Sequence, residues 1–132
     1  MTDYVVDASV LAYALIGKTA AADELRTKLR CSGCHAPHLV DAEVGNVLRR
    51  LTRAHEITAA HAHTALHAAV EIIDYRYPHT GQLAESAWAF RDNLSFYDAL
   101  YVALATRLEI PLITADRRLS KAPGLTCAIE LI

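Results

Sequence analysis

Short apolar runs alternate with longer amphipathic or alanine-rich segments along the whole chain. The short runs have the length of strands, whereas the longer segments repeat apolar residues at helical spacing. The predicted strands span residues 4–6, 35–40, 71–75, 112–114 and 126–131. The predicted helices span residues 9–16, 20–30, 41–51, 58–70, 82–91 and 95–109.

This alternation of strands and helices predicts an α/β fold. Parallel strands joined by right-handed helical crossovers form a sheet that is covered on both faces. We therefore expect one three-layer domain over residues 1–132, with a central parallel sheet of about five strands flanked by helices. In such sheets ligands bind beyond the carboxyl ends of the strands, so the candidate chemistry lies in the residues at those ends.

The composition is that of an ordinary globular protein. Hydrophobic residues make up 53% and charged residues 21% of the 132 residues, and no apolar run is long enough to cross a bilayer. Asp3 and Asp7 lie in the N-terminal segment, which does not resemble a secretory signal, so we expect a cytoplasmic protein with reduced thiols. The formal net charge of -2 gives no bulk electrostatic signal for nucleic-acid binding.

Residues 31–35, CSGCH, form the most conspicuous short motif. The pattern C-x-x-C-H attaches haem in c-type cytochromes, and C-x-x-C is also a redox or zinc spacing. A cytochrome needs export and a second axial ligand, and zinc needs further cysteine or histidine partners. A thioredoxin-type site follows a strand, whereas Cys31 and Cys34 follow a predicted helix. We therefore interpret the segment as a helix-to-strand turn in which Gly33 supplies the bend.

Four acidic residues from distant segments are predicted to meet at one edge of the sheet. Asp7 and Asp116 follow the ends of the first and fourth predicted strands. Glu43 lies in the first turn of the helix that leaves the second strand. Asp98 lies in the first turn of the helix predicted at 95–109, which runs antiparallel to the next strand and so begins near that strand's carboxyl end.

Each of these acids also has a structural explanation of its own. Asp7 and Asp116 are suited to cap helices. Glu43 suits the positive end of a helix dipole, and Ser95 with Asp98 forms a capping box. Four carboxylates at one edge nevertheless repel one another, and a bound cation removes that conflict. Oxygen ligands suit the hard ions Mg²⁺ and Mn²⁺, which activate water and neutralise phosphate in phosphodiester hydrolysis.

The sequence resembles PIN-domain nucleases in four motifs that occur in the family's order. These are VVDAS near the N-terminus, DAEVGNVL in the first third, FYDALYVALA late in the chain and LITADRRL near the end. Together they extend over almost the whole chain, and its short length is typical of VapC-type toxins of bacterial toxin–antitoxin pairs. The resemblance implies a homodimeric, Mg²⁺- or Mn²⁺-dependent endoribonuclease that cleaves tRNA or ribosomal RNA and is inhibited by a VapB-type antitoxin.

The resemblance also implies roles for individual residues. The family's catalytic and metal-binding acids fall on Asp7, Glu43, Asp98 and Asp116. Ser9 and Thr114 match the hydroxyl positions beside the first and last acids, and Asn46 matches a polar position one turn after the glutamate. The candidates for contacts with RNA phosphates are Arg49, Arg50, Arg117 and Arg118. Plain surface solubility is an equally supported explanation of these four arginines.

Other chemistry-bearing residues receive a simpler interpretation. His63, His67 and Glu71 follow one another at helical spacing, but a zinc site needs a third ligand of fixed geometry, so a polar helix face is preferred. Trp88 is predicted to pack in the core or in an interface, and Tyr97 is also predicted to pack.

Two other classes of function stay open. A phospho-receiver signalling domain also carries acids at one sheet edge, but it expects a pair of acids after the first strand, where only Asp7 is present. It also leaves Glu43 and Asp98 without roles. A catalytically silent protein-binding module is the other alternative, although all four acids are present.

Overall fold

The computed structural model describes residues 1–132 and contains a sheet of five parallel strands in the order β3-β2-β1-β4-β5. The strands are β1 (Asp3–Val6), β2 (Gly33–Pro37), β3 (Tyr75–Tyr77), β4 (Leu112–Thr114) and β5 (Ile129–Leu131). Every pairing between neighbouring strands is parallel, so all carboxyl ends lie at one edge of the sheet. The predicted α/β fold with a parallel sheet is confirmed.

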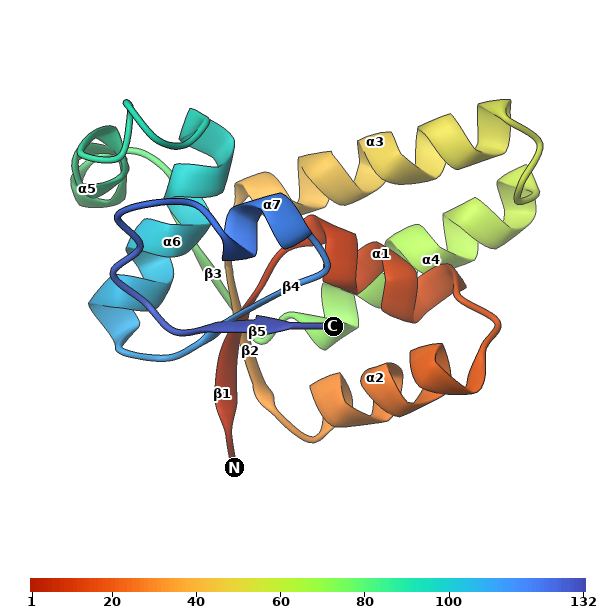
Figure 1. Ribbon diagram of the computed structural model, residues 1–132. Helices are drawn as coiled ribbons and strands as arrows, with labels where there is room; N and C mark the ends of the chain where they lie inside the picture. The colour runs from red at the N-terminus through yellow and green to blue at the C-terminus, as the bar shows by residue number, and fades with distance from the viewer.

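Helices cover both faces of the sheet (Figure 1). They are α1 (Ala8–Ile16), α2 (Ala20–Arg30), α3 (Leu39–Arg53), α4 (Ala59–Ile72), α5 (Gln82–Trp88), α6 (Phe96–Leu108) and α7 (Arg117–Ser120). Helices α1 to α4 lie on one side of the sheet, and α5 and α6 lie on the other, which gives the expected three layers. None of these helices combines the length and the apolar character needed to span a bilayer.

The central strands and α6 are apolar because they are enclosed by other elements. Val5 and Val6 of β1 and Leu112 and Ile113 of β4 are fully buried. In α6 every residue from 99 to 105 is buried, so this part of the helix has no polar face. Its packing between α5 and the sheet places the first turn of α6 at the carboxyl edge of the strands.

The second strand begins and ends earlier than the predicted 35–40, and that prediction is wrong in its bounds. It occupies Gly33–Pro37, and α3 begins directly after its N-cap, His38. Asp41, where the predicted helix 41–51 was expected to begin, lies instead in the first turn of α3. Its carboxylate accepts hydrogen bonds from Arg76 Nε and Nη2 at 2.7 and 2.9 Å. Because Arg76 is distant in sequence, a local capping pattern does not reveal this ion pair.

The third strand begins later than the predicted 71–75, and that prediction is also wrong in its bounds. Glu71 and Ile72 continue α4, because Ile72 is buried on the apolar face of that helix. The strand is Tyr75–Tyr77 at the edge of the sheet. An apolar run at the end of a buried helix and a short strand have similar patterns, so periodicity does not separate them.

The CSGCH segment joins α2 to β2, but Gly33 does not supply the bend. Gly33 is already part of β2, and its φ lies outside the left-handed region. A Cβ atom at this position would lie 2.3 Å from Asp3 Oδ1, so the glycine makes room for the Asp3 carboxylate. The other oxygen of that carboxylate lies 3.0 Å from His35 Nε2. Cys34 is buried, and burial raises the pKa of its thiol to about 12.

Neither Trp88 nor Tyr97 packs in the core, so the core alternative for Trp88 and the packing predicted for Tyr97 within this chain are wrong. Each residue is 60% exposed. Trp88 ends α5 and Tyr97 lies in the first turn of α6, where both helices reach the surface. The Arg91 guanidinium lies 5.5 Å from the centre of the Trp88 ring and forms a cation–π contact. Packing of Trp88 in an interface with another chain stays a prediction.

Candidate functional site

The four acids singled out in the sequence line one cavity of about 370 Å³ at the carboxyl edge of the sheet. Asp7 is the N-cap of α1 and Asp116 is the N-cap of α7. Glu43 lies near the start of α3, and Asp98 lies in the first turn of α6. The cavity is also lined by Ala8, Ser9, Asn46, Val47, Arg50, Tyr101 and Arg118. The beginnings of four helices therefore contribute one acid each.

Asp7 is the most enclosed of the four acids, with 7% of its surface exposed. Its Oδ1 accepts hydrogen bonds from Ser9 Oγ at 2.6 Å and from Val10 N at 3.0 Å, and its Oδ2 accepts one from Thr114 Oγ1. Burial raises the pKa of the Asp7 carboxyl, while these three donors oppose the rise and Asp116 adds to it. The donors hold both oxygens in one orientation.

Thr114 connects the first acid with the last. Its hydroxyl donates to Asp7 Oδ2 and accepts a hydrogen bond from Asp116 N at 3.0 Å. The Asp116 carboxylate in turn accepts from the amides of Arg118 and Leu119, at 2.9 and 3.4 Å, through Oδ1. A fully buried side chain of β4 thus sets the spacing between two loop residues.

Glu43 is oriented by a residue whose role the sequence analysis did not identify. Tyr101 Oη donates a hydrogen bond to Glu43 Oε1 at 2.5 Å. Burial raises the pKa of Glu43, the Tyr101 hydroxyl opposes that rise, and Asp98 and Asp7 add to it. Tyr101 follows Asp98 by one helical turn, which puts both on one face of α6. That spacing is the signal in the sequence that could have identified it.

Asp98 combines a backbone role with a position on the cavity wall. Its N–H donates to Ser95 Oγ at 3.1 Å, so Ser95 caps α6 as the sequence predicted. Burial raises the pKa of the Asp98 carboxyl, Asp116 and Asp7 raise it further, and Arg118 lowers it. Capping and a role at the cavity are therefore compatible, because the cap uses the Asp98 amide and not its carboxylate.

The positive charge around the cavity is small compared with the four carboxylates. Arg118 Nε lies 3.6 Å from Asp116 Oδ1, and Arg50 lines the wall. No three His, Cys, Asp or Glu side chains lie close enough together to hold a metal ion as they stand. Mg²⁺ and Mn²⁺ do not need such an enclosure, because they are bound through one or two carboxylates and keep several waters. The all-oxygen donor set and the buried Asp7 carboxylate fit an ion of this class.

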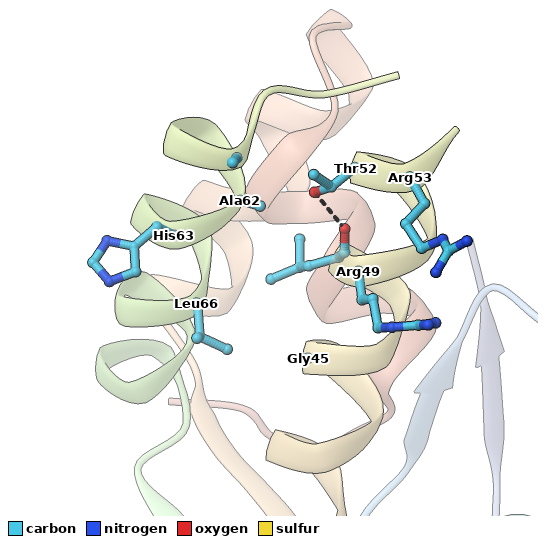
Figure 2. A pocket seen from close by; sticks show the side chains of 9 residues that line it. Gly45, Arg49, Thr52, Arg53, Ala62, His63 and Leu66 are labelled. Atoms are coloured by element: carbon cyan, nitrogen blue, oxygen red, sulfur yellow. Dashed lines mark hydrogen bonds between the residues drawn. The ribbon is translucent and has the colours of Figure 1, made fainter. Parts of the chain in front are cut away.

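The four candidate arginines separate into two groups. Arg50 and Arg118 line the acidic cavity, and Asn46 lies with them. Arg49 lines a different groove of about 320 Å³ between α3 and α4 (Figure 2), because consecutive residues of a helix point about 100° apart. Arg117 is exposed on α7 and is not part of the cavity wall.

Comparison with known proteins identifies the family. The sequence profile of the PIN domain matches residues 4–125. Ribonuclease VapC1 of Mycobacterium tuberculosis is 52% identical over 132 residues, which are 100% of this chain and 99% of that protein.

Solved structures show the same fold. A chain in the crystal structure of VapBC2 from Rickettsia felis bound to a promoter DNA fragment superposes with a TM-score of 0.73 at 11% identity, over 99% of both chains. Mycobacterium tuberculosis VapC20, a toxin that cleaves the Sarcin-Ricin loop, superposes with a TM-score of 0.66 at 22% identity, over 90% of this chain and 93% of that one. The chain belongs to the PIN-domain family and, within it, to the VapC-type ribonuclease toxins.

Proposed function

We propose that the chain hydrolyses RNA phosphodiesters with Mg²⁺ or Mn²⁺ held by Asp7, Glu43, Asp98 and Asp116. The observation that carries this proposal is the cavity that all four acids line. In three of them, Asp7, Glu43 and Asp98, burial and the neighbouring carboxylates raise the pKa, so the negative charge gathered at the cavity is unfavourable. A divalent cation compensates that charge.

The protein's own contribution is to hold the carboxylates in fixed positions. Ser9 and Thr114 orient Asp7, and Tyr101 orients Glu43. When bound, the ion supplies activation of water and neutralisation of charge at the phosphate. Pre-oriented ligands lower the cost of rearrangement during the reaction. No serine or cysteine nucleophile is needed for this chemistry.

The matching experiment uses purified chain without antitoxin, total RNA, and Mg²⁺ or Mn²⁺. We expect cleavage that EDTA abolishes and that Asp7→Asn and Asp98→Asn each reduce by at least about a hundredfold. Asp23→Asn is the matched control, since Asp23 is exposed on α2 and does not line the cavity. Cleavage that continues unchanged in EDTA, or in both site variants, excludes the proposed mechanism.

Arg50 and Arg118 are proposed to contact RNA phosphates at the mouth of this cavity. Adjacent arginines provide matched controls: Arg49→Ala for Arg50→Ala, and Arg117→Ala for Arg118→Ala. With Ca²⁺ in place of the catalytic ion, we expect the cavity variants to weaken RNA binding and reduce its dependence on salt, and the neighbours to change both much less. Equal losses in both members of each pair would support a diffuse surface effect instead.

A VapB-type antitoxin is the proposed partner, as the family implies, and the groove between α3 and α4 offers it a surface (Figure 2). Leu48 and Leu66 provide apolar contacts there, and Arg49 and Arg53 provide positive charge. This combination suits a segment with apolar and acidic side chains. We expect expression of the chain to arrest growth and co-expression of the neighbouring gene to restore it. Normal growth with soluble, folded chain would contradict the toxin role.

The substrate, the oligomeric state and the compartment follow from the family as proposals. We propose a homodimer that acts in the cytoplasm on tRNA or ribosomal RNA; the related VapC20 cleaves the Sarcin-Ricin loop. Sequencing of newly formed RNA ends in cells expressing the chain identifies the substrate. Light scattering of the purified chain measures the oligomeric state.

A further inference from the structure

Two histidines on α4 lie outside the acidic cavity and have no role in the proposed hydrolysis. His63 and His67 are one helical turn apart, so their side chains share one face of the helix. Their Nε2 atoms are 3.3 Å apart, the ring centres are 4.6 Å apart, and the ring planes make an angle of 80°. Both residues are exposed, and His63 also lines the groove between α3 and α4 (Figure 2).

We propose that His63 and His67 form a two-imidazole binding site for a divalent transition-metal ion such as Zn²⁺, Ni²⁺ or Cu²⁺. With zinc–nitrogen bonds of about 2.0–2.1 Å, two ligands of a tetrahedral ion are about 3.3–3.4 Å apart. The observed separation of 3.3 Å between the two Nε2 atoms matches this value. The separation of the two nitrogens therefore needs little change for both to bind one ion.

The chemistry of this pair differs from that of the acidic cavity. Imidazole nitrogen favours borderline ions in the order Cu²⁺ above Zn²⁺ and Ni²⁺, whereas carboxylates with water favour Mg²⁺ and Mn²⁺. No third His, Cys, Asp or Glu side chain joins the pair, so a closed structural zinc site is absent, as expected from the sequence. The proposed site is instead an open one, in which water completes the coordination of the ion. His61 lies two positions from His63, about 200° around the helix, and does not share its face.

A hydrogen bond between the two rings is the competing explanation of the short contact. In that arrangement one neutral imidazole donates its N–H to the other, and the pair binds no ion. In the proposed metal site, by contrast, protons compete with the metal ion for the same nitrogen atoms, so binding of the ion weakens as the pH falls. The two explanations differ in whether zinc binding depends on both rings.

The test is a zinc titration of the untagged full chain against a chromophoric indicator, with millimolar Mg²⁺ present to occupy the acidic cavity. We expect His63→Ala and His67→Ala each to lower the Zn²⁺ affinity by at least about tenfold. His61→Ala is the matched control on the same helix and retains the affinity of the wild type. Asp98→Asn retains it as well, because that acid belongs to the other site.

Two outcomes would overturn the proposal. The pair is not the site if both single variants bind Zn²⁺ like the wild type, and the acidic cavity is the site if Asp98→Asn abolishes binding. Circular dichroism of each variant shows that α4 is intact, which we expect because His63 and His67 are exposed. Failure of this test leaves the proposed hydrolysis unaffected, since the RNA cleavage assay measures it separately.

Discussion

Thr114→Val removes one hydroxyl from the centre of the candidate site and keeps the shape of the side chain. Thr114 has no exposed surface. Its hydroxyl donates to the buried carboxylate of Asp7 and accepts a hydrogen bond from the amide of Asp116. In the variant, Asp7 Oδ2 and the Asp116 amide lose these partners. The substitution thus tests whether this hydroxyl organises the acids.

The expected loss of stability is large for a change of so few atoms. A hydrogen bond to a charged group contributes about 1.5–3 kcal/mol and one between neutral groups about 1 kcal/mol. We therefore expect Thr114→Val to lower the free energy of unfolding by about 2–4 kcal/mol. For a chain of 132 residues this corresponds to a fall in melting temperature of roughly 10 °C. Ribonuclease activity is expected to fall too, because Asp7 loses one of its orienting donors.

The stability difference between wild type and variant also depends on pH. Burial raises the pKa of Asp7 in the folded chain, and the hydrogen bond from Thr114 opposes that rise. Without this bond the folded-state pKa of Asp7 rises further. The full difference in the free energy of unfolding is therefore present at pH values at which Asp7 is ionised in both the wild type and the variant. It shrinks as the pH falls through these raised values, because a protonated carboxyl needs the donor less.

Urea denaturation in EDTA, at neutral and at mildly acidic pH, measures this difference. Thr114→Ser is the control, because it keeps the hydroxyl and loses only a methyl group, at a cost of about 1 kcal/mol. Our reasoning is refuted if Thr114→Val unfolds at the same urea concentration as the wild type. It is also refuted if the serine variant is destabilised as much as the valine variant.

Three further substitutions have defined expected outcomes. Asp98→Asn removes a carboxylate whose pKa is raised by burial, so we expect the variant to have a higher melting temperature than the wild type in EDTA at neutral pH. This advantage disappears as the pH falls through the raised pKa of Asp98. A lower melting temperature of the variant at neutral pH would contradict the reasoning. Tyr101→Phe removes the donor to Glu43 and should lower the free energy of unfolding by about 1–3 kcal/mol, measured in urea, together with a loss of RNA cleavage. Gly33→Ala brings a Cβ to within 2.3 Å of Asp3 Oδ1 and should cost about 1–3 kcal/mol. Because the clash is with that carboxylate, adding Asp3→Ala should restore most of this loss; equal stability of the single and double variants would argue against the contact.

The order of the elements and the location of the acids could be predicted from the sequence. Apolar runs and amphipathic segments alternate, and alternation of this kind leads to a parallel sheet with every carboxyl end at one edge. Asp7 directly follows β1, Asp116 lies two residues after β4, and Asp98 lies three residues after the serine that caps α6. Their common edge therefore depends only on the direction of the chain. Bounds of short elements were less predictable, as β2 and β3 show, because neighbouring apolar residues suit either a helix or a strand.

Only the tertiary structure decided which side chains orient the acids. The Tyr101 hydroxyl reaches Glu43 from a separate helix, and Thr114 links Asp7 with Asp116 across two neighbouring strands. The tertiary structure also separates Arg49 from Arg50: they are adjacent in the sequence, but Arg49 lines the groove between α3 and α4 and Arg50 lines the acidic cavity. The sequence by itself determined the fold and the edge at which the acids gather, because periodicity and chain direction are local properties. Hydrogen bonds between distant residues depend on packing, and therefore only the folded chain reveals them.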